Sequence, residues 1–255
     1  MADMTDDIVA APPLVCALVD ESAYAASVAE HGAWLAERLR AKLELRHVRE
    51  GHETPPQGRD LLEGLAATLA DQGAPRPQLS LGEGGVLGSA LSAGAAAVVM
   101  GKRGGRADQS REHLGRHVEP LVRAMTVPIC LASQVFLPIH RVVAVTDADP
   151  NRRAAIDLVA LHAGQDVELD VLVVSREGEV ADDKVALARQ ALDGRAQAFA
   201  IRAERIGQGI WRYLRDRPSD LIVISRAVLL GDNGPGLSAA PPGSFWSARA
   251  SVVVC

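Results

Sequence analysis

The chain has 255 residues, 48% of them hydrophobic and 23% charged, which is typical of a soluble globular protein with one large or two ordinary domains. Only 3% of the residues are aromatic and the formal net charge is −5, so the composition disfavours nucleic-acid recognition by base stacking or phosphate neutralisation. No apolar run has the length of a membrane span and the first residues lack the pattern of a signal peptide, so we expect a cytoplasmic protein without a membrane partner.

The first half alternates short apolar runs with amphipathic segments. Runs at 14–19, 43–48, 77–82, 95–100 and 129–132 predict strands, and helical spacing of apolar residues predicts helices at 25–39, 61–69, 86–91 and from Gly115 onward. In the second strand, Glu44 and Arg46 predict a side that faces outward. Pro55 and Pro56 predict a loop before the second helix.

The same order of elements restarts at residue 141. Strands are predicted at 141–146, 167–174, 198–201, 221–225 and 251–255, with helices at 154–161, 180–192 and 206–215. We therefore predict an α/β protein with two tandem domains, 13–133 and 139–255, each an open, twisted, mainly parallel five-stranded sheet with helices on both faces. The joint between the domains is too short for independent movement.

Positive charge is concentrated in the loop after the fourth strand, against the trend of an acidic chain. Between residues 101 and 116 five basic residues stand against two acidic ones: Lys102, Arg103, Arg106, Arg111 and Arg116 against Asp108 and Glu112. Glycines beyond a strand let backbone N–H groups approach a phosphate, and a following helix adds its positive end. The alternative is an ordinary turn with solvated basic side chains.

This loop also carries a family resemblance. MGKRG, followed by GRHVEPLVRAMTVPICLA, resembles the end of a universal stress protein domain, whose pattern is Gly, two residues, Gly, nine residues, Gly, then Ser or Thr. Gly101, Gly104 and Gly115 match the glycines, with ten residues between the last two, and Arg116 replaces the hydroxyl residue. The resemblance implies an adenine-nucleotide alpha hydrolase-like fold and a loop that binds the phosphates of ATP, with Mg²⁺. Arg116 is suited to pairing with a phosphate.

Two more residues of the first half follow from this resemblance. Asp20 comes directly after the first strand, and Val48 ends the second. If the first and fourth strands are neighbours, as in universal stress proteins, Asp20 and Gly101 flank one crevice. The resemblance then implies that Asp20 faces the ribose or adenine and that the backbone of Val48 meets the adenine. The alternative for Asp20 is a helix N-cap, which is compatible with binding.

The second half departs further from the pattern. Asp147 follows its first strand, and Gly243 with Ser244 resembles the closing Gly–Ser pair, but Ser225 stands where the first loop glycine should be. Residues 227–243 contain no basic side chain. We therefore predict that any ATP binds in the first half. The remaining glycines of this connection predict a flexible loop rather than a second cradle: Gly231, Gly234 and Gly236.

No residue pattern indicates a metal site or a catalytic centre. The cysteines (Cys16, Cys130 and Cys255) lie in apolar runs typical of buried small side chains. His113 and His117 have no third ligand at a recognisable spacing, so a solvated basic face is the better interpretation.

The sequence leaves three hypotheses for function. The first is a tandem universal stress protein that binds an adenine nucleotide in a stress-response or regulatory role. The second is a degenerate module that has lost nucleotide and acts through protein–protein interaction, and the third is a weak ATPase. Residues 129–132 and 251–255 are predicted to pair within one chain, as an intramolecular pseudo-dimer, because an unpaired apolar edge favours aggregation. A second copy of the chain is a further candidate partner.

Overall fold

A computed structural model of the chain describes residues 12–49, 55–103, 114–147, 149, 153–175, 182–232, 234–237 and 244–255. Strands and helices alternate in the first half, as predicted. Its elements are β1 (Leu14–Val19), α1 (Ala25–Leu39), β2 (Lys42–Val48), α2 (Pro55–Asp71), β3 (Gln78–Gly82), α3 (Val86–Ser92), β4 (Ala97–Gly101), α4 (Val118–Ala124) and β5 (Ile129–Ala132).

The second half repeats this order, with a short helix that the sequence pattern did not predict. Its elements are β6 (Arg141–Thr146), α5 (Ala154–His162), β7 (Glu168–Ser175), α6 (Asp182–Gln190), β8 (Ala196–Arg202), α7 (Ile206–Asp216), β9 (Leu221–Ile224), α8 (Arg226–Leu230), a 3₁₀ turn (Phe245–Ser247) and β10 (Ser251–Val254). The unpredicted element is α8, which directly follows β9 in place of an open loop.

Three local predictions in the first half are wrong. The prolines expected in a loop begin α2, because proline lacks an N–H that the first helical turn does not need. The fourth helix begins at Val118, after a turn, and not at Gly115. Glu44 is buried, because Arg46 bonds it at 2.8 Å from Nε and itself donates to the carbonyl of Ser89 at 2.7 Å.

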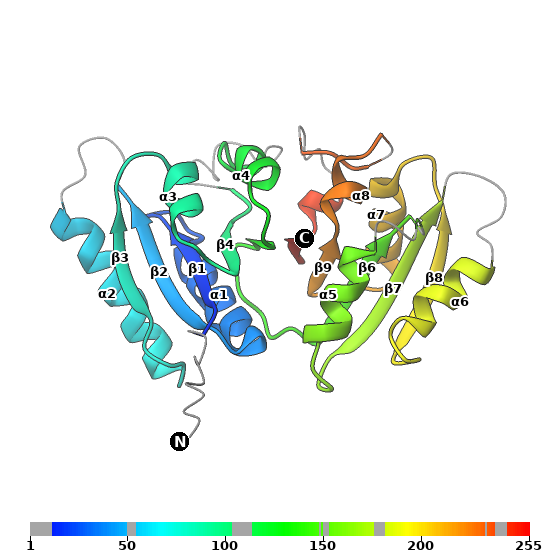
Figure 1. The fold of residues 1–255 in the computed structure, drawn as a ribbon, viewed down its shortest axis with the longest axis horizontal. Coiled ribbons are helices and arrows are strands. Elements are labelled where there is room, and N and C mark those ends of the chain that lie inside the picture. Colours follow the sequence, from blue (N-terminus) through cyan, green and yellow to red (C-terminus); the bar gives the residue numbers. More distant parts are fainter. Residues whose placement is uncertain are drawn as a thin grey trace, which may run out of the picture.

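The two halves share one ten-stranded sheet in the order β3-β2-β1-β4-β5-β10-β9-β6-β7-β8. Every neighbouring pair is parallel except β5 and β10, which are antiparallel. The expectation of two separate sheets is therefore corrected. Figure 1 shows the two halves side by side, with the segment between β5 and β6 passing from one to the other along the lower edge.

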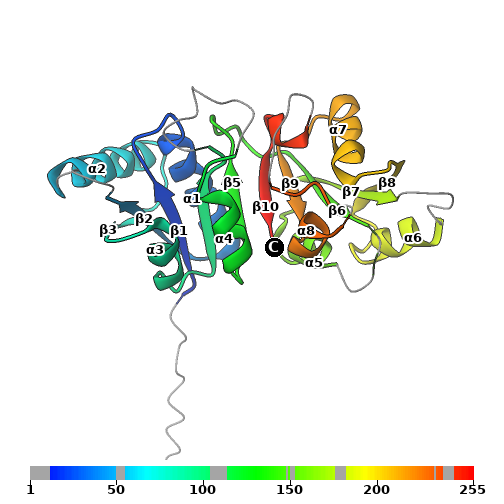
Figure 2. The ribbon, with the colours of Figure 1, turned by 90° about the horizontal axis from the view of Figure 1, so that it is seen from above.

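The junction between the halves is the pairing of β5 with β10, which we call the seam. Leu131, Cys130 and Ile129 pair in register with Val252, Val253 and Val254. Figure 2 shows the two strands side by side at the centre of the molecule. The prediction that these apolar strands pair within the chain is confirmed, and each strand supplies the partner that the other would otherwise lack.

Each face of the sheet carries one apolar layer that continues across the seam. On one face α1, α2 and α5 pack against the strands, through residues such as Val28, Leu62 and Val159. On the other face α4, α7, α8 and the 3₁₀ turn do so, through residues such as Leu121 and Trp246. Since both layers include residues of both halves, the halves share their cores.

A buried polar group fastens the seam. The Nδ1–H of His31 on α1 donates to the carbonyl of Ser27 at 2.7 Å, so the opposite ring nitrogen accepts from Ser251 Oγ on β10 at 2.6 Å. The Ser251 hydroxyl oxygen also accepts from the Ser133 N–H at 3.0 Å. Burial lowers the pKa of His31 from 6.5 to about 4. The neutral imidazole thus satisfies both neighbours, and its protonation is disfavoured.

This group predicts acid sensitivity of the fold. His31 becomes protonated below about pH 6.5 in the unfolded chain but only below about pH 4 in the folded chain. The contribution of His31 to the free energy of unfolding is therefore complete above pH 6.5 and decreases as the pH falls from 6.5 to about 4. The loss from this residue should reach about 3 kcal/mol at pH 4. Urea unfolding from pH 7 to pH 4 of the wild type and His31→Gln measures it, because the substitution removes only this titration. Parallel pH profiles for the two proteins would contradict the prediction.

Candidate functional site

The candidate site lies where the direction of chain connections reverses in the first half. The chain runs from β1 outward to β2 and β3, then crosses to β4 and β5 on the other side of β1. The condition set by the sequence is met, because β1 and β4 are neighbours, with Cys16 in register with Val98. Asp20 follows the end of β1 and Gly101 ends β4, so both lie at the carboxyl edge of the sheet, where ligands bind in open α/β folds.

Asp20 organises the turn between β1 and α1. Its exposed carboxylate accepts from the Ser22 N–H at 3.1 Å and from the Ser22 hydroxyl. The N-cap of α1 is Tyr24, so Asp20 shapes the turn before the helix and is not itself the cap. One residue beyond the last pair of β1 with β2, Val48 is buried at the same edge.

A histidine that no sequence pattern indicated supports this edge. His47 is buried, and its Nδ1 lies 2.9 Å from the carbonyl oxygen of Val19, the last residue of β1. This contact joins the carboxyl ends of β1 and β2 directly beside Asp20 and Val48. A histidine within an otherwise apolar and charged strand has no distinctive pattern, so only the three-dimensional arrangement identifies its role.

Gly101 is packed rather than open. A Cβ atom added to it would lie 2.9 Å from the carbonyl oxygen of Arg103 and 3.0 Å from two atoms of the Tyr24 side chain. Tyr24 is itself buried at the start of α1. Glycine at this position therefore allows the backbone of Arg103 and the Tyr24 side chain to lie close to the end of β4, whether or not a ligand binds there.

Gly101→Ala should destabilise the protein by about 1–3 kcal/mol, because the added methyl group displaces either Tyr24 or the backbone of Arg103. Gly88→Ala is the matched control: Gly88 lies in α3, and a Cβ atom there meets nothing within 4 Å among the described residues. The control should be neutral or stabilising by up to about 1 kcal/mol. Thermal or urea unfolding measures both variants. Equal stability of Gly101→Ala and wild type would show that Tyr24 moves without cost.

Lys102 does not belong to the cationic loop that the sequence suggested. Its side chain is buried, and Nζ donates across the seam to the carbonyl oxygens of Ala248, at 3.2 Å, and Ala250. Burial, with a smaller contribution from Arg103, lowers the pKa of Lys102 to about 7. The amine is therefore directed into the second half and away from any phosphate at the loop.

The second half makes an equivalent contact with the first half, through Arg226. Arg226 occupies the position after β9 that Lys102 occupies after β4. The backbone N–H of Arg226 donates to the carbonyl of Cys255 at 2.7 Å, and the backbone N–H of Lys102 donates to the carbonyl of Ala132 at 3.1 Å. The Arg226 guanidinium donates to carbonyl oxygens of the first half, those of Val122, at 3.0 Å, and Val127. A cation from each half thus bonds the backbone of the other.

The returning end of the loop is held by the backbone. The Gly115 N–H donates to the carbonyl of Lys102 at 2.8 Å, which brings the third glycine of the motif back to the end of β4. Arg116 is exposed, and its Nε lies 2.8 Å from Nε2 of His117. Gly104 and the other basic residues of the loop between 104 and 113 lie outside the described residues.

The corresponding edge of the second half begins in the same way. Asp147 follows β6 and accepts from the Asp149 N–H at 3.2 Å, as Asp20 accepts from Ser22. After β9, however, the Ser225 hydroxyl caps α8 by accepting from the Val228 N–H at 3.2 Å. A helix thus stands where the first half has its glycine loop.

Aromatic side chains fill the space beyond this helix. Phe245 and Trp246 are each only 1% exposed, and the Trp246 indole donates to the carbonyl of Gly236 at 3.1 Å. A Cβ atom on Gly234 would lie 2.3 Å from a carbonyl oxygen of α8, so this glycine packs against the helix. The connection expected to be a flexible loop is a packed turn here. Ser244 precedes the 3₁₀ turn, and Gly243 lies outside the described residues.

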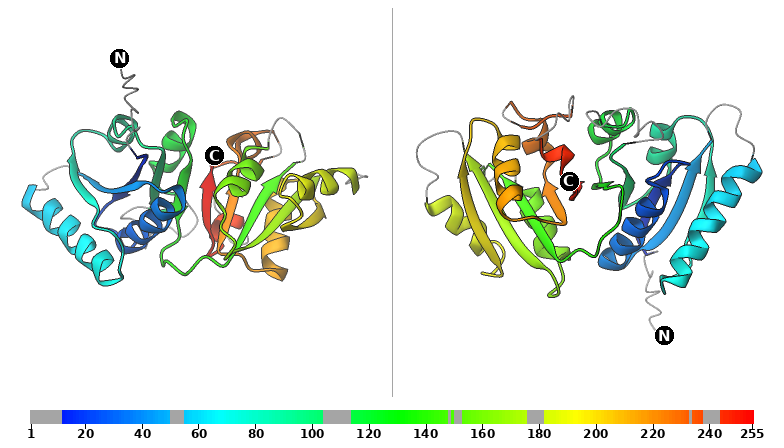
Figure 3. Two further views of the ribbon diagram at one scale, coloured as in Figure 1. Left: turned by 60° about the horizontal axis from the view of Figure 1, so that its bottom comes forward. Right: turned by 180° about the vertical axis from the view of Figure 1, so that it is seen from behind.

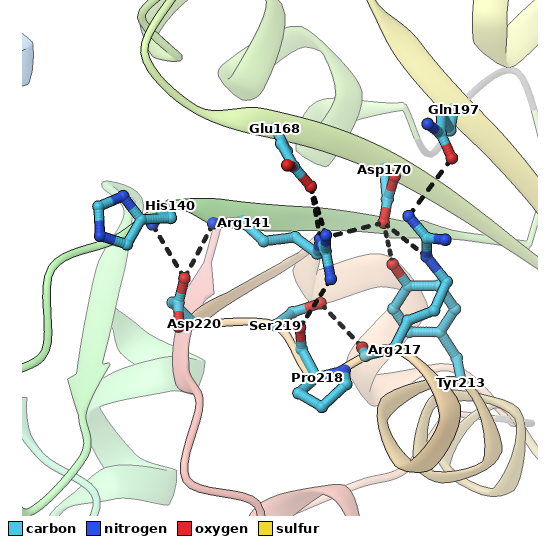
Figure 4. A network of polar contacts seen from close by, with 10 residues as sticks. All are labelled: His140, Arg141, Glu168, Asp170, Gln197, Tyr213, Arg217, Pro218, Ser219 and Asp220. Carbon is cyan, nitrogen blue, oxygen red and sulfur yellow. Dashed lines mark hydrogen bonds and ion pairs between the residues drawn. The ribbon is translucent and has the colours of Figure 1, made fainter.

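The other prominent cluster of titratable groups lies at the opposite edge of the sheet (Figure 4). Asp170, near the amino end of β7, is 2% exposed and accepts from the Tyr213 hydroxyl and, at 3.4 Å, from Arg217 Nε. Arg141 Nε is 4.0 Å from the same carboxylate. Burial and the bond to Asp170 raise the pKa of Tyr213. These groups satisfy one another, which indicates that the cluster joins β6, β7 and α7.

Tyr213→Phe should lower the free energy of unfolding by about 1–3 kcal/mol, because it removes a donor from a buried carboxylate. Arg215→Ala on the same helix is the control and should change stability by no more than about 0.5 kcal/mol, since Arg215 and Asp216 are both exposed. Urea unfolding at pH 7 compares them. If Tyr213→Phe matches the wild type, Arg217 alone satisfies Asp170.

No group of three or more His, Cys, Asp and Glu side chains in the described segments is arranged to hold a metal ion. Within the same segments, no helix is both long enough and apolar enough to cross a membrane.

Comparison with solved structures identifies the fold class as that of universal stress proteins. A universal stress protein from Archaeoglobus fulgidus superimposes with a TM-score of 0.65 and 14% identity, over 95% of this chain and 96% of that one. A putative universal stress protein from Pseudomonas aeruginosa UCBPP-PA14 superimposes with a TM-score of 0.61 and 13% identity, over 96% of this chain and 93% of that one.

A protein of unknown function from Pseudomonas aeruginosa PAO1 gives the same score and identity, over 96% of this chain and 92% of that one. No family model and no curated protein sequence matches the chain. The fold therefore extends over nearly the whole tandem chain at low sequence identity.

Proposed function

We propose that the chain is a tandem universal stress protein of the cytoplasm that binds an adenine nucleotide, ATP with Mg²⁺, in its first half and serves a regulatory role in stress response. The observation that carries this proposal is the arrangement at the β1–β4 reversal. There Asp20 and Gly101 stand at one edge, and Gly115 is bonded back to the end of β4.

Three parts of this edge would hold the nucleotide. The Asp20 carboxylate is exposed and suited to accepting hydrogen bonds from ribose hydroxyls. Val48 would offer its backbone to the adenine. The β4 loop would offer backbone N–H groups and its arginines to the phosphates, with Arg116 exposed beside the last glycine.

The contrast between the halves supports binding in the first one only. In the second half α8 and its Ser225 cap occupy the position of the glycine loop, and the cation next to that position, Arg226, bonds carbonyl oxygens across the seam. A triphosphate there would lose the charge-assisted hydrogen bonds on which such sites depend. Asp147, Gly243 and Ser244 are accordingly remnants of a second site in this proposal.

Two observations favour a module without nucleotide. Lys102 is withdrawn from the loop to the seam, and Gly101 is packed by Tyr24, so both features have structural roles that need no ligand. In this second candidate function the joined halves act through contacts with other proteins. We assign no catalytic residue, and no group among the described residues supports an ATPase activity.

Calorimetric titration of Mg·ATP into the wild type, Asp20→Ala and Asp147→Ala tests the proposal. The two substitutions are matched, because each removes a carboxylate that accepts a backbone N–H two residues later. We expect wild-type binding with one site per chain, about tenfold or greater weakening in Asp20→Ala, and no change in Asp147→Ala.

Other outcomes would replace this assignment. Weakening confined to Asp147→Ala would place the nucleotide in the second half. Absence of binding in all three proteins would favour the protein-interaction module. Thermal unfolding of the three proteins serves as the control for folding.

A further inference from the structure

An apolar cavity of about 310 Å³ lies between the two halves, independent of the candidate nucleotide site. Trp34 and Leu35 of α1 form one wall, Leu158 and Val159 of α5 form the other, and Val253 of β10 lies at the floor. Figures 1 and 3 show α1 and α5 on opposite sides of the seam, near the segment that joins the halves. The cavity thus sits on the opposite face of the sheet from α4 and α8.

The cavity exists because the two halves differ in the length of one helix. Two residues separate the end of α1 from β2, whereas five separate the end of α5, at His162, from β7. The last turn present in α1 is therefore missing from α5, and the space beside it stays unfilled. Residues of the substituting loop, Ala163, Gly164 and Val167, contribute to the lining.

One charged side chain lines this apolar cavity. The guanidinium of Arg38 lies 5.6 Å from the Trp34 ring centroid and is held by Asp166 through Nη1 at 2.7 Å. Its Nε is shielded from solvent, so the groups within reach of a ligand are the N–H groups of the two Nη atoms. Each Nη carries two N–H groups and Asp166 accepts from one on each, so a ligand acceptor can bond the guanidinium without displacing Asp166.

The charges around the cavity select against an ionised ligand. Asp166 already balances the charge of Arg38 and has its pKa lowered to about 2 by that contact, so it stays ionised at neutral pH. The other titratable side chain of the lining is His162, whose pKa burial lowers, so its neutral form is favoured. A carboxylate in the cavity would find no uncompensated cation among these described residues.

We propose that this cavity binds a compact, uncharged apolar molecule with a single hydrogen-bond acceptor, such as an aryl ketone, whose acceptor meets an N–H group of the Arg38 guanidinium. The volume is at the lower end of the range of about 300–1,000 Å³ for small-molecule sites, which suits a small ring system rather than a lipid chain. An apolar lining of this kind favours the binding of an apolar ligand. Since both walls contact the ligand, binding would stabilise the seam.

The fluorescent probe 1-aminoanthracene tests the site directly in the whole chain. Leu158→Trp should fill the cavity and weaken probe binding at least tenfold. Leu161→Trp is the matched control, because Leu161 lies on the same helix but is 76% exposed, and it should bind as the wild type does. Equal binding by all three proteins, or no binding by the wild type, would overturn the proposal.

Competition against the probe tests the ligand class. Butyrophenone should displace it at about tenfold lower concentration than butylbenzene, the same molecule without the carbonyl, and Arg38→Met should abolish this preference. Displacement by 4-phenylbutyrate at lower concentration than by butyrophenone would show a carboxylate site and refute the uncharged class. A ketone preference that survives in Arg38→Met would refute the role of Arg38.

Energy transfer from tryptophan places the probe even if Leu158→Trp does not fold. Trp34 lines the cavity, whereas Trp211 lies on α7, which packs on the other face of the sheet. Trp34→Phe should therefore remove more of the transfer to bound 1-aminoanthracene than Trp211→Phe does. The reverse order would place the probe elsewhere and contradict the proposal.

Discussion

The antiparallel pairing of β5 with β10 is the constraint on which the rest of the structure depends. Both strands are fully buried and, apart from Ser251, apolar, and each lies at the edge of its own half. Pairing them turns two exposed edges into the centre of one sheet, so that each apolar layer continues across both halves. The buried contacts of His31 with Ser251, and of Lys102 and Arg226 with backbone carbonyls, all lie at this junction.

Shared topology does not give the two halves equal chemistry. Both place an aspartate after their first strand, and both reverse direction beside it. The two halves differ at the end of the next strand: Gly101 packs against Tyr24 and the backbone of Arg103, whereas Ser225 starts a helix. The Ser225 cap thus begins helix α8 at the position that a loop occupies in the first half. Phe245 and Trp246 are buried beside this helix.

The basic residues near this edge in the sequence do not all direct their side chains toward it. Lys102 lies among basic residues in sequence but is directed into the seam, and Arg226 makes the reciprocal contact from the second half. Both are cations whose partners are carbonyl oxygens, which need no specific side chain and leave no trace in the sequence. Glu44 shows the same effect within a strand, since its burial depends on Arg46 and on Ser80 from the neighbouring strand.

Local pattern in the sequence determined the alternation of strands and helices, the repeat and the pairing of residues 129–132 with 251–255, because buried strands and apolar edges have strong hydrophobic signatures. It also determined that Asp20 and Gly101 end neighbouring strands, once the strand order of related folds was assumed. The tertiary structure alone decided that the sheets merge, that Lys102 faces the seam, that α8 follows Ser225, and that a shortened α5 leaves a cavity. Apart from the Ser225 cap, which is a local contact, these features arise from contacts between residues far apart in the chain, and the propensity of a short segment carries no information about such partners.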